Sequence, residues 1–195
     1  MPEILIVSKT KMRHGCCVSG IDIATNVALR LLPAGGNHQP ADSPLEIGEV
    51  WAGTYKMRGT AAPFVEDATV VLTQRLRVQS VARYVAASVP TANGSTDAVY
   101  DGLLHWNPSK GYLEPAAPTP YSTQFWRPDS TLRLYDNDNK LIFWEPKTGR
   151  RIPWVGVAAP PKVVMAQSLA RLSLSRPFAG NLDHEVCWSQ LSSVY

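Results

Sequence analysis

The residues that could do chemistry in this 195-residue chain are mainly basic and aromatic. In the first half, cations in or beside predicted turns adjoin two aromatic residues of a predicted strand: Lys9, Lys11, Arg13, Trp51, Tyr55, Lys56 and Arg58. The second half has a similar supply of cations, which are Arg150, Arg151, Lys162, Arg171 and Arg176, and tryptophans 126, 144, 154 and 188. If one face of the fold gathers such residues, the cations could contact phosphates and the rings could stack on bases. The alternative is that most of the tryptophans are core residues and that the lysines are only solvated.

A metal site has weaker support from the cysteine and histidine residues. His14 and Cys16 are two residues apart and would share one face of a strand, whereas His184 and Cys187 are three apart and would lie on opposite faces. A zinc site built from all four would need a turn between the last two, and the spacings match no standard ligand motif. We therefore predict no metal site and no cofactor.

Catalytic signatures are also missing from the sequence. The neighbours Glu66 and Asp67 would point to opposite faces of a strand, so they do not form a ready acid–base pair. Ser173 and Ser175 lack a G-x-S-x-G context, and no G-K-[ST] follows the glycine pair at 35–36. We therefore expect that the protein is not an enzyme.

Short apolar runs separated by turn residues dominate the elements that would position these side chains. Residues 4–7, 16–23 and 27–32 form such runs, with a polar and basic turn over 8–15, and predict an antiparallel meander. A strand is predicted over 45–55 and a hairpin over 131–144, with its turn at 136–139. Residues 73–89 contain no proline or glycine before Pro90 and predict a helix. The proline-rich segment 90–115 is predicted to be a connector.

The composition is that of a globular protein of modest positive charge. Hydrophobic residues make up 45% of the chain and charged residues 18%, and the formal net charge is +3, which is too small to indicate a nucleic-acid partner by itself. Three cysteines, two of them adjacent, are a poor disulfide framework and are typical of a reducing compartment. No apolar run approaches the roughly 20 residues of a membrane span. We expect a cytoplasmic protein with no membrane partner.

The order and spacing of six segments resemble the prokaryotic family of dual OB-containing domain proteins. These segments are residues 4–22, 45–51, 63–67, 122–126, 163–178 and 187–195, and the resemblance covers nearly the whole chain. It implies two small OB-like barrels, no established catalytic residues, a link to nucleic acids and, for some relatives, a setting in phage defence. OB barrels commonly bind oligonucleotides on one face, with stacking aromatic residues and a basic groove.

We predict an all-β fold with one or two short helices and two small OB-like β-barrels. The first barrel, with a C-terminal helix, is expected over 1–89, the connector over 90–115 and the second barrel over 116–195. The expected function is non-enzymatic binding of single-stranded or structured nucleic acid, as a subunit of a larger complex that could serve phage defence. The alternatives are a protein-interaction or scaffold module and a sensor that holds a nucleotide ligand between the barrels.

Overall fold

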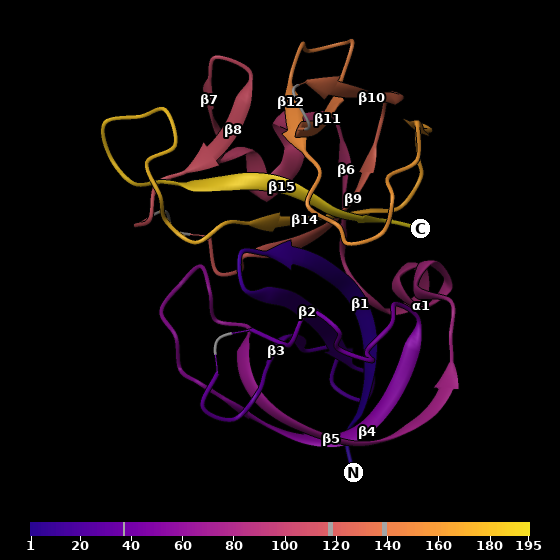
Figure 1. Ribbon diagram of the computed structural model, residues 1–195. Helices are drawn as coiled ribbons and strands as arrows, with labels where there is room; N and C mark the ends of the chain where they lie inside the picture. Colours follow the sequence, from indigo (N-terminus) through magenta and orange to yellow (C-terminus); the bar gives the residue numbers. More distant parts are fainter. Residues whose placement is uncertain (37, 117–118, 138–139) are drawn as a thin grey trace. The chain divides into compact units, whose positions relative to one another are not determined.

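The computed structural model describes residues 1–36, 38–116, 119–137 and 140–195 (Figure 1). The described chain is built mostly of β-strands, with two short helices, which confirms the predicted fold class. It divides into two compact units. The first comprises Met1–Pro90 together with Gly156–Ala158, and the second comprises Thr91–Val155 together with Ala159–Tyr195.

The first unit is a closed five-stranded barrel followed by a short helix (Figure 1). The strands follow one another around the barrel in the order β1-β2-β3-β5-β4. All neighbours are antiparallel except β3 and β5, which pair in parallel and close the barrel. The elements are β1 (Glu3–Met12), β2 (Gly15–Asp22), β3 (Ala28–Leu32), β4 (Glu49–Met57), β5 (Asp67–Val78) and α1 (Val81–Ser88).

Alternating aliphatic residues fill the interior of this barrel. Ile4 and Ile6 of β1, Val18 of β2 and Leu29 and Leu31 of β3 are at most 1% exposed and belong to one cluster. In each of these strands the clustered residues are spaced by two, because successive side chains of a strand point to opposite faces. One face of each of these strands therefore forms the barrel interior, although residues of the other face of β1, such as Leu5 (0% exposed) and Val7 (1%), are buried as well.

Two further segments of the first unit pack along its strands. The loop of residues 33–48 runs beside β2, where Gln39 and Cys16 exchange two backbone hydrogen bonds of 2.9 Å. Gly15 permits this approach, because a Cβ at that position would lie 2.3 Å from the carbonyl oxygen of Gln39. Residues 156–158 pair with β1, where the Val157 amide donates to the carbonyl of Lys9 (2.9 Å).

The second unit is built around a ten-stranded sheet (Figure 1). Its strand order is β13-β10-β11-β12-β8-β15-β14-β9-β6, and β7 pairs with β8 outside this path. The buried core includes Trp126, Leu132, Phe143 and Leu172, each 0% exposed. The elements are β6 (Thr91–Gly94), η1 (Thr96–Gly102), β7 (His105–Asn107), β8 (Lys110–Leu113), β9 (Thr123–Pro128), β10 (Leu132–Asn137), β11 (Lys140–Trp144), β12 (Arg151–Pro153), β13 (Val163–Val164), β14 (Ala170–Leu174) and β15 (Cys187–Val194).

The segment 90–115 differs from the predicted connector, because it forms β6, η1, β7 and β8 of the second unit. β6 pairs in parallel with β9, and β8 lies between β12 and β15. Pro90, Pro108 and Pro115 fall just outside strand ends, where a missing N–H removes no bond from a ladder. The second unit therefore begins at Thr91 instead of residue 116.

Two predicted element boundaries in the first unit are also wrong. Residues 73–78, predicted to be helical, continue β5, because β4 supplies partners as far as the Glu49–Val78 pair. The helix is limited to Val81–Ser88. The predicted turn over 8–15 is mostly strand, since β1 runs to Met12 and leaves only residues 13–14 between β1 and β2. The predicted hairpin is present as β10 and β11, and residues 138–139 of its predicted turn lie outside the described residues.

Candidate nucleic-acid interface

A row of side chains crosses five neighbouring strands of the second unit. Trp144 of β11 pairs with Arg133 of β10 on one side and with Arg151 of β12 on the other. Arg133 also pairs with Val163 of β13, and Arg151 with Lys110 of β8. Directly paired residues of adjacent strands have side chains on the same face of a sheet. We call these five residues, Val163, Arg133, Trp144, Arg151 and Lys110, the Trp144 row.

The Trp144 row lies on the outward face of this sheet. The residues adjacent to the row in the same strands point to the opposite face of the sheet. They are buried, since Leu132 and Phe143 are 0% exposed and Ile152 is 4% exposed, so this opposite face packs against the core. By contrast, Trp144 is 40% exposed. Arg133 and Arg151 are exposed and Lys110 is half-buried. The row therefore presents a large aromatic ring to solvent between two guanidinium groups.

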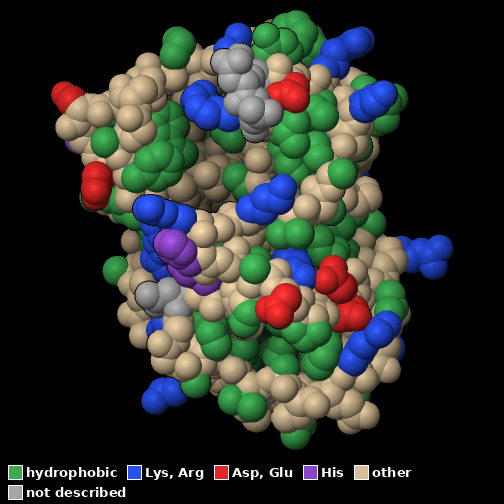
Figure 2. Space-filling view, viewed as in Figure 1, with side chains coloured by type: hydrophobic (Ala, Val, Ile, Leu, Met, Phe, Trp, Pro, Cys, Tyr) green, Lys and Arg blue, Asp and Glu red, His purple; other side chains and the backbone are tan. Residues whose placement is uncertain are grey.

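The charges of the Trp144 row are not neutralised within the described chain. Arg133, Arg151 and Lys110 make no ion pair with any described acidic residue. Tyr135 lies two residues beyond Arg133 on the same face and is 56% exposed, which adds a second ring. Figure 2 shows basic, acidic and hydrophobic side chains in the part of this view where Figure 1 draws β10 and β11. The face can thus offer both positive charge and stacking surface.

A buried carboxylate fixes the end of β11 next to Trp144. Glu145 is 1% exposed and accepts hydrogen bonds from the hydroxyls of Thr96 (2.6 Å), Ser130 (2.9 Å) and Thr148. These three residues come from η1, from the loop before β10 and from the turn between β11 and β12. The carboxylate therefore ties together the segments that position Trp144.

Arg150 and Arg151 are adjacent in the sequence, but their side chains lie on different faces of the sheet. The Arg150 guanidinium lies over the Trp106 ring, 4.1 Å from its centroid, and pairs with Asp97 at 3.2 Å. Arg151 points to the opposite face and joins the Trp144 row. Of the other predicted cations in this half, Arg171 is 3% exposed, with Nη1 donating to Ser192 Oγ (3.3 Å), and Arg176 is exposed after β14. Arg171, predicted as one of the cations that could contact phosphates, is therefore buried.

The predicted residues of the first half are not gathered on one surface. Lys9 is 8% exposed, and its Nζ donates to the carbonyl of Ser43 and to the carboxylate of Glu46, both at 2.7 Å. It is therefore a buried residue of β1 instead of an exposed turn residue. Lys11 and Arg13 are exposed at the end of β1 and in the following turn. The structure thus separates Lys9 from the two other cations of the predicted turn.

The predicted aromatic residues of β4 face the barrel interior. Trp51 and Tyr55 pack against the buried cluster, and the Tyr55 hydroxyl donates to the Asp22 carboxylate at 2.9 Å. Burial, together with the bond to Asp22, raises the pKa of Tyr55. Lys56 is exposed on the opposite face of β4 from Tyr55. Arg58 is exposed but binds the carbonyls of residues 33 and 36 (3.1 and 2.8 Å), so it holds the loop of residues 33–48.

The sequence analysis missed Arg133, Lys110 and Tyr135. Two of them could have been found, since the alternation in the predicted hairpin already places residues 133 and 135 on one face. The third could not, because Lys110 joins the row through a parallel pair between β8 and β12, and residues 90–115 were predicted to be a connector. Strand pairing across 41 residues of sequence is not visible in a local pattern.

The cysteine and histidine residues are dispersed. His14 is exposed, whereas the thiol of Cys16 is buried and lies 3.1 Å from the carbonyl of Pro40. His184 is near Glu114 and Asp183, whose hydrogen bonds raise its pKa. Cys187 belongs to the second unit, and burial raises the pKa of its thiol to about 11. Among the described residues there is no group of three or more His, Cys, Asp or Glu that could hold a metal ion.

A closed five-stranded barrel followed by further short strands defines a protein of the OB-fold class. The family model described as "Dual OB-containing domain" matches residues 2–194, and the chain belongs to this family. The comparison with curated proteins found no match, and neither did the comparison with solved structures. OB-fold domains commonly bind nucleic acids or proteins. In the described chain, no helix is long and apolar enough to cross a membrane.

Proposed function

We propose that the protein is a non-enzymatic module that binds single-stranded nucleic acid across the Trp144 row. The observation that carries this proposal is the exposed Trp144 ring between the cross-strand partners Arg133 and Arg151. Neighbouring strands are about 4.8 Å apart, so the two guanidinium groups flank the ring at roughly one strand spacing on each side. A base stacked on Trp144 would then carry its phosphates past two cations.

The chemistry of the row favours an unpaired strand over a duplex. Stacking on a protein ring requires a base whose face is free, and bases inside a duplex already stack on one another. Every base has a π-face, and the row supplies cations for phosphates, so the expected binding depends little on sequence. Tyr135, on the same face, provides a second platform for a neighbouring base.

The first test is fluorescence anisotropy of the full chain with labelled single-stranded DNA, single-stranded RNA and duplex at low salt. Trp144→Ala is expected to weaken single-strand binding roughly 5- to 150-fold, because one base–aromatic stack contributes about 1–3 kcal/mol. Phe178→Ala is the matched control, since Phe178 is 47% exposed in the same unit but lies outside the row. The control is expected to bind as the wild type does.

Charge reversal tests the cations separately from the ring. Arg133→Glu combined with Arg151→Glu is expected to abolish measurable single-strand binding, whereas Arg83→Glu, an exposed arginine of α1, should retain it. Absence of binding by the wild type at low salt would reject the proposal. Equal affinity of the double variant and the wild type would exclude the Trp144 row as the interface.

A protein-binding function is the second candidate, and one observation favours it. Val163, at the end of the row, is 41% exposed, and Met165, two residues further along the chain, is 61% exposed. Trp, Tyr and Arg are also the residues that dominate protein–protein hot spots. Binding to nucleic acid falls steeply with salt, whereas burial of an apolar interface does not, so salt dependence separates the two. We propose further that the chain is a subunit of a larger complex, for example in phage defence, and this part of the proposal rests on the family resemblance alone.

A further inference from the structure

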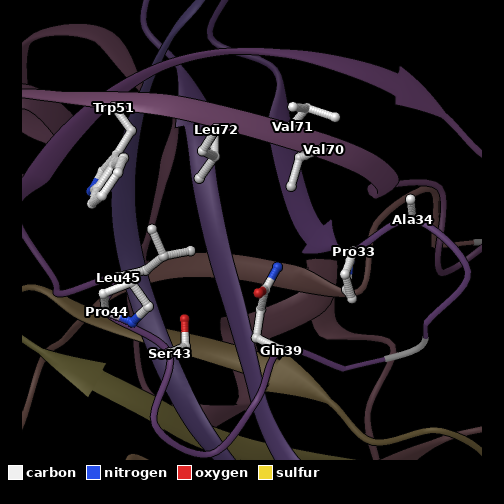
Figure 3. Close-up of a pocket in the computed structure, with 10 residues that line it drawn as sticks. All are labelled: Pro33, Ala34, Gln39, Ser43, Pro44, Leu45, Trp51, Val70, Val71 and Leu72. Atoms are coloured by element: carbon white, nitrogen blue, oxygen red, sulfur yellow. The ribbon is translucent and has the colours of Figure 1, made fainter.

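The first unit contains a pocket of about 330 Å³ that the Trp144 row does not involve. Side chains from β4 and β5 form one wall, and the loop of residues 33–48 forms the other (Figure 3). The lining residues are Pro33, Ala34, Gln39, Ser43, Pro44, Leu45, Trp51, Val70, Val71 and Leu72. Its volume is at the lower end of the range for ligand pockets, which is roughly 300–1,000 Å³, and suits a single ring system.

The pocket exists because the two parallel strands that close the barrel differ in length. β3 ends at Leu32, which pairs with Thr69, while β5 continues to Val78. Beyond Thr69, β5 keeps β4 on one side but no described strand on the other. The loop of residues 33–48 covers this part of β5, and the pocket lies between the loop and Val70–Leu72 of the strand (Figure 3).

A buried hydroxyl without a partner points into this space. Ser43 is 4% exposed, and its Oγ has no hydrogen-bond partner among the residues that the structure describes. Figure 3 shows the hydroxyl directed from the loop toward the strands. The backbone of Ser43 is held in place, since Lys9 Nζ donates to its carbonyl at 2.7 Å. Buried polar groups are nearly always paired, so this hydroxyl indicates a missing hydrogen-bonding partner.

The remaining lining defines the chemistry of that partner. Of the ten described lining residues none is charged, and the ammonium of Lys9 is already engaged by Ser43 and Glu46. Gln39 Nε2 donates to the carbonyl of Leu31 (2.9 Å), which leaves the side-chain oxygen of Gln39 as an acceptor in the lining. The pocket thus combines apolar walls with a hydroxyl and an amide oxygen, and it lacks a cation for a phosphate.

The orientation of the Trp51 ring supports a flat ligand. Its indole N–H donates to the Glu49 carboxylate at 2.9 Å, which holds the ring at the side of the pocket. We propose that the pocket binds an uncharged planar heterocycle of nucleobase size, with Ser43 Oγ and the Gln39 amide oxygen bonded to its polar edge. The heterocycle can be a free nucleoside or one unstacked base of a longer strand. This inference goes beyond the Trp144 row and does not depend on it.

The experiment is isothermal titration of the full chain with uridine, cytidine, adenosine and guanosine, with ribose 5-phosphate as a ligand that lacks the base. At least one nucleoside is expected to bind, and Ser43→Ala is expected to weaken that binding at least tenfold. Ser189→Ala is the matched control, because Ser189 is also 4% exposed but lies in β15 of the second unit. The melting temperature of unliganded Ser43→Ala should be unchanged or higher, since the hydroxyl has no partner to lose.

A second arm separates the two sources of the heterocycle. Anisotropy with single-stranded oligonucleotides should show weaker binding by Ser43→Ala if the pocket takes a base of a strand, and unchanged binding if it takes a free nucleoside. Trp144→Ala should leave nucleoside affinity unchanged, so a failure of the Trp144 row and a failure of the pocket give different results. The inference is overturned if Ser43→Ala alters neither nucleoside nor strand binding, or if ribose 5-phosphate binds as tightly as the nucleosides.

Discussion

Lys9 connects β1 to the loop that forms one wall of the pocket, because its ammonium bonds both to the Ser43 carbonyl and to the Glu46 carboxylate. Lys9→Met retains most of the apolar stem but leaves the buried carbonyl without its donor. We expect the free energy of unfolding, measured by urea denaturation, to fall by about 1–3 kcal/mol. Lys11→Met, at an exposed position of the same strand, should change it by less than about 0.5 kcal/mol. Equal effects of the two substitutions would contradict this structural role.

For single residues, the sequence predicts the face of a strand on which a side chain lies but not whether a cation is buried. Alternation within a strand gives the face of a side chain, as it does for Arg133 and Tyr135, because the period of two is local. Burial of a cation depends instead on partners that are distant in the chain. The partners of Lys9 are 34 and 37 residues away, and Ser192 is 21 residues from Arg171. These two cations could not be separated from surface residues by residue type or by neighbouring sequence.

The strand β11 carries Trp144 into the row, and the buried carboxylate of Glu145 secures its end. Glu145→Gln preserves the shape of the side chain but replaces one acceptor oxygen by a donor NH₂ group, which faces hydroxyls that now donate to the carboxylate. We expect a loss of about 1–3 kcal/mol in the free energy of unfolding, together with weaker single-strand binding. Glu185→Gln, an exposed position of the same unit, should alter neither quantity. An unchanged stability of Glu145→Gln would show that the carboxylate does not hold β11.

At the level of elements, the sequence predicted most of what depends on local pattern. The apolar runs of the first 32 residues and the hairpin of β10 and β11 are present as strands. The errors are elements whose conformation is selected by a distant partner. Residues 73–78 lack Pro and Gly and could form a helix, yet β4 extends far enough to pair with them. Likewise, β6 and β8 are short strands that form by pairing with distant partners. β6 pairs with β9, and β8 pairs with β12 and β15.

The molecule as a whole carries a formal net charge of only +3, so its affinity for nucleic acid should depend on the few cations of the Trp144 row. For a single strand, log K falls with log[salt] with a slope of about −0.7 per phosphate neutralised. Arg133, Arg151 and Lys110 together predict a slope of about −2. Arg133→Ala should reduce the slope by about 0.7 in anisotropy titrations between 50 and about 200 mM salt. A slope near −5 in the wild type would require an interface with many more cations.

The family and the fold class could be predicted because six segments of the sequence, each weak as a single motif, resemble the family in their order and spacing. The match over residues 2–194 confirms the family. The location of the pocket could not be predicted. It arises from the difference in length between β3 and β5, and this difference depends on the parallel pairing that closes the barrel. The nucleotide-sensor alternative, with its ligand held between the barrels, stays a prediction.

Residues 156–158 follow β12 in the chain, yet they complete the first unit by pairing with β1. The first unit is therefore discontinuous in the sequence, and no single cut in the chain gives both units intact. A fragment ending at residue 90 would lack the segment that covers the backbone of Lys9 and Thr10. Separate production of the two units from one cut in the chain is thus expected to leave the first unit incomplete.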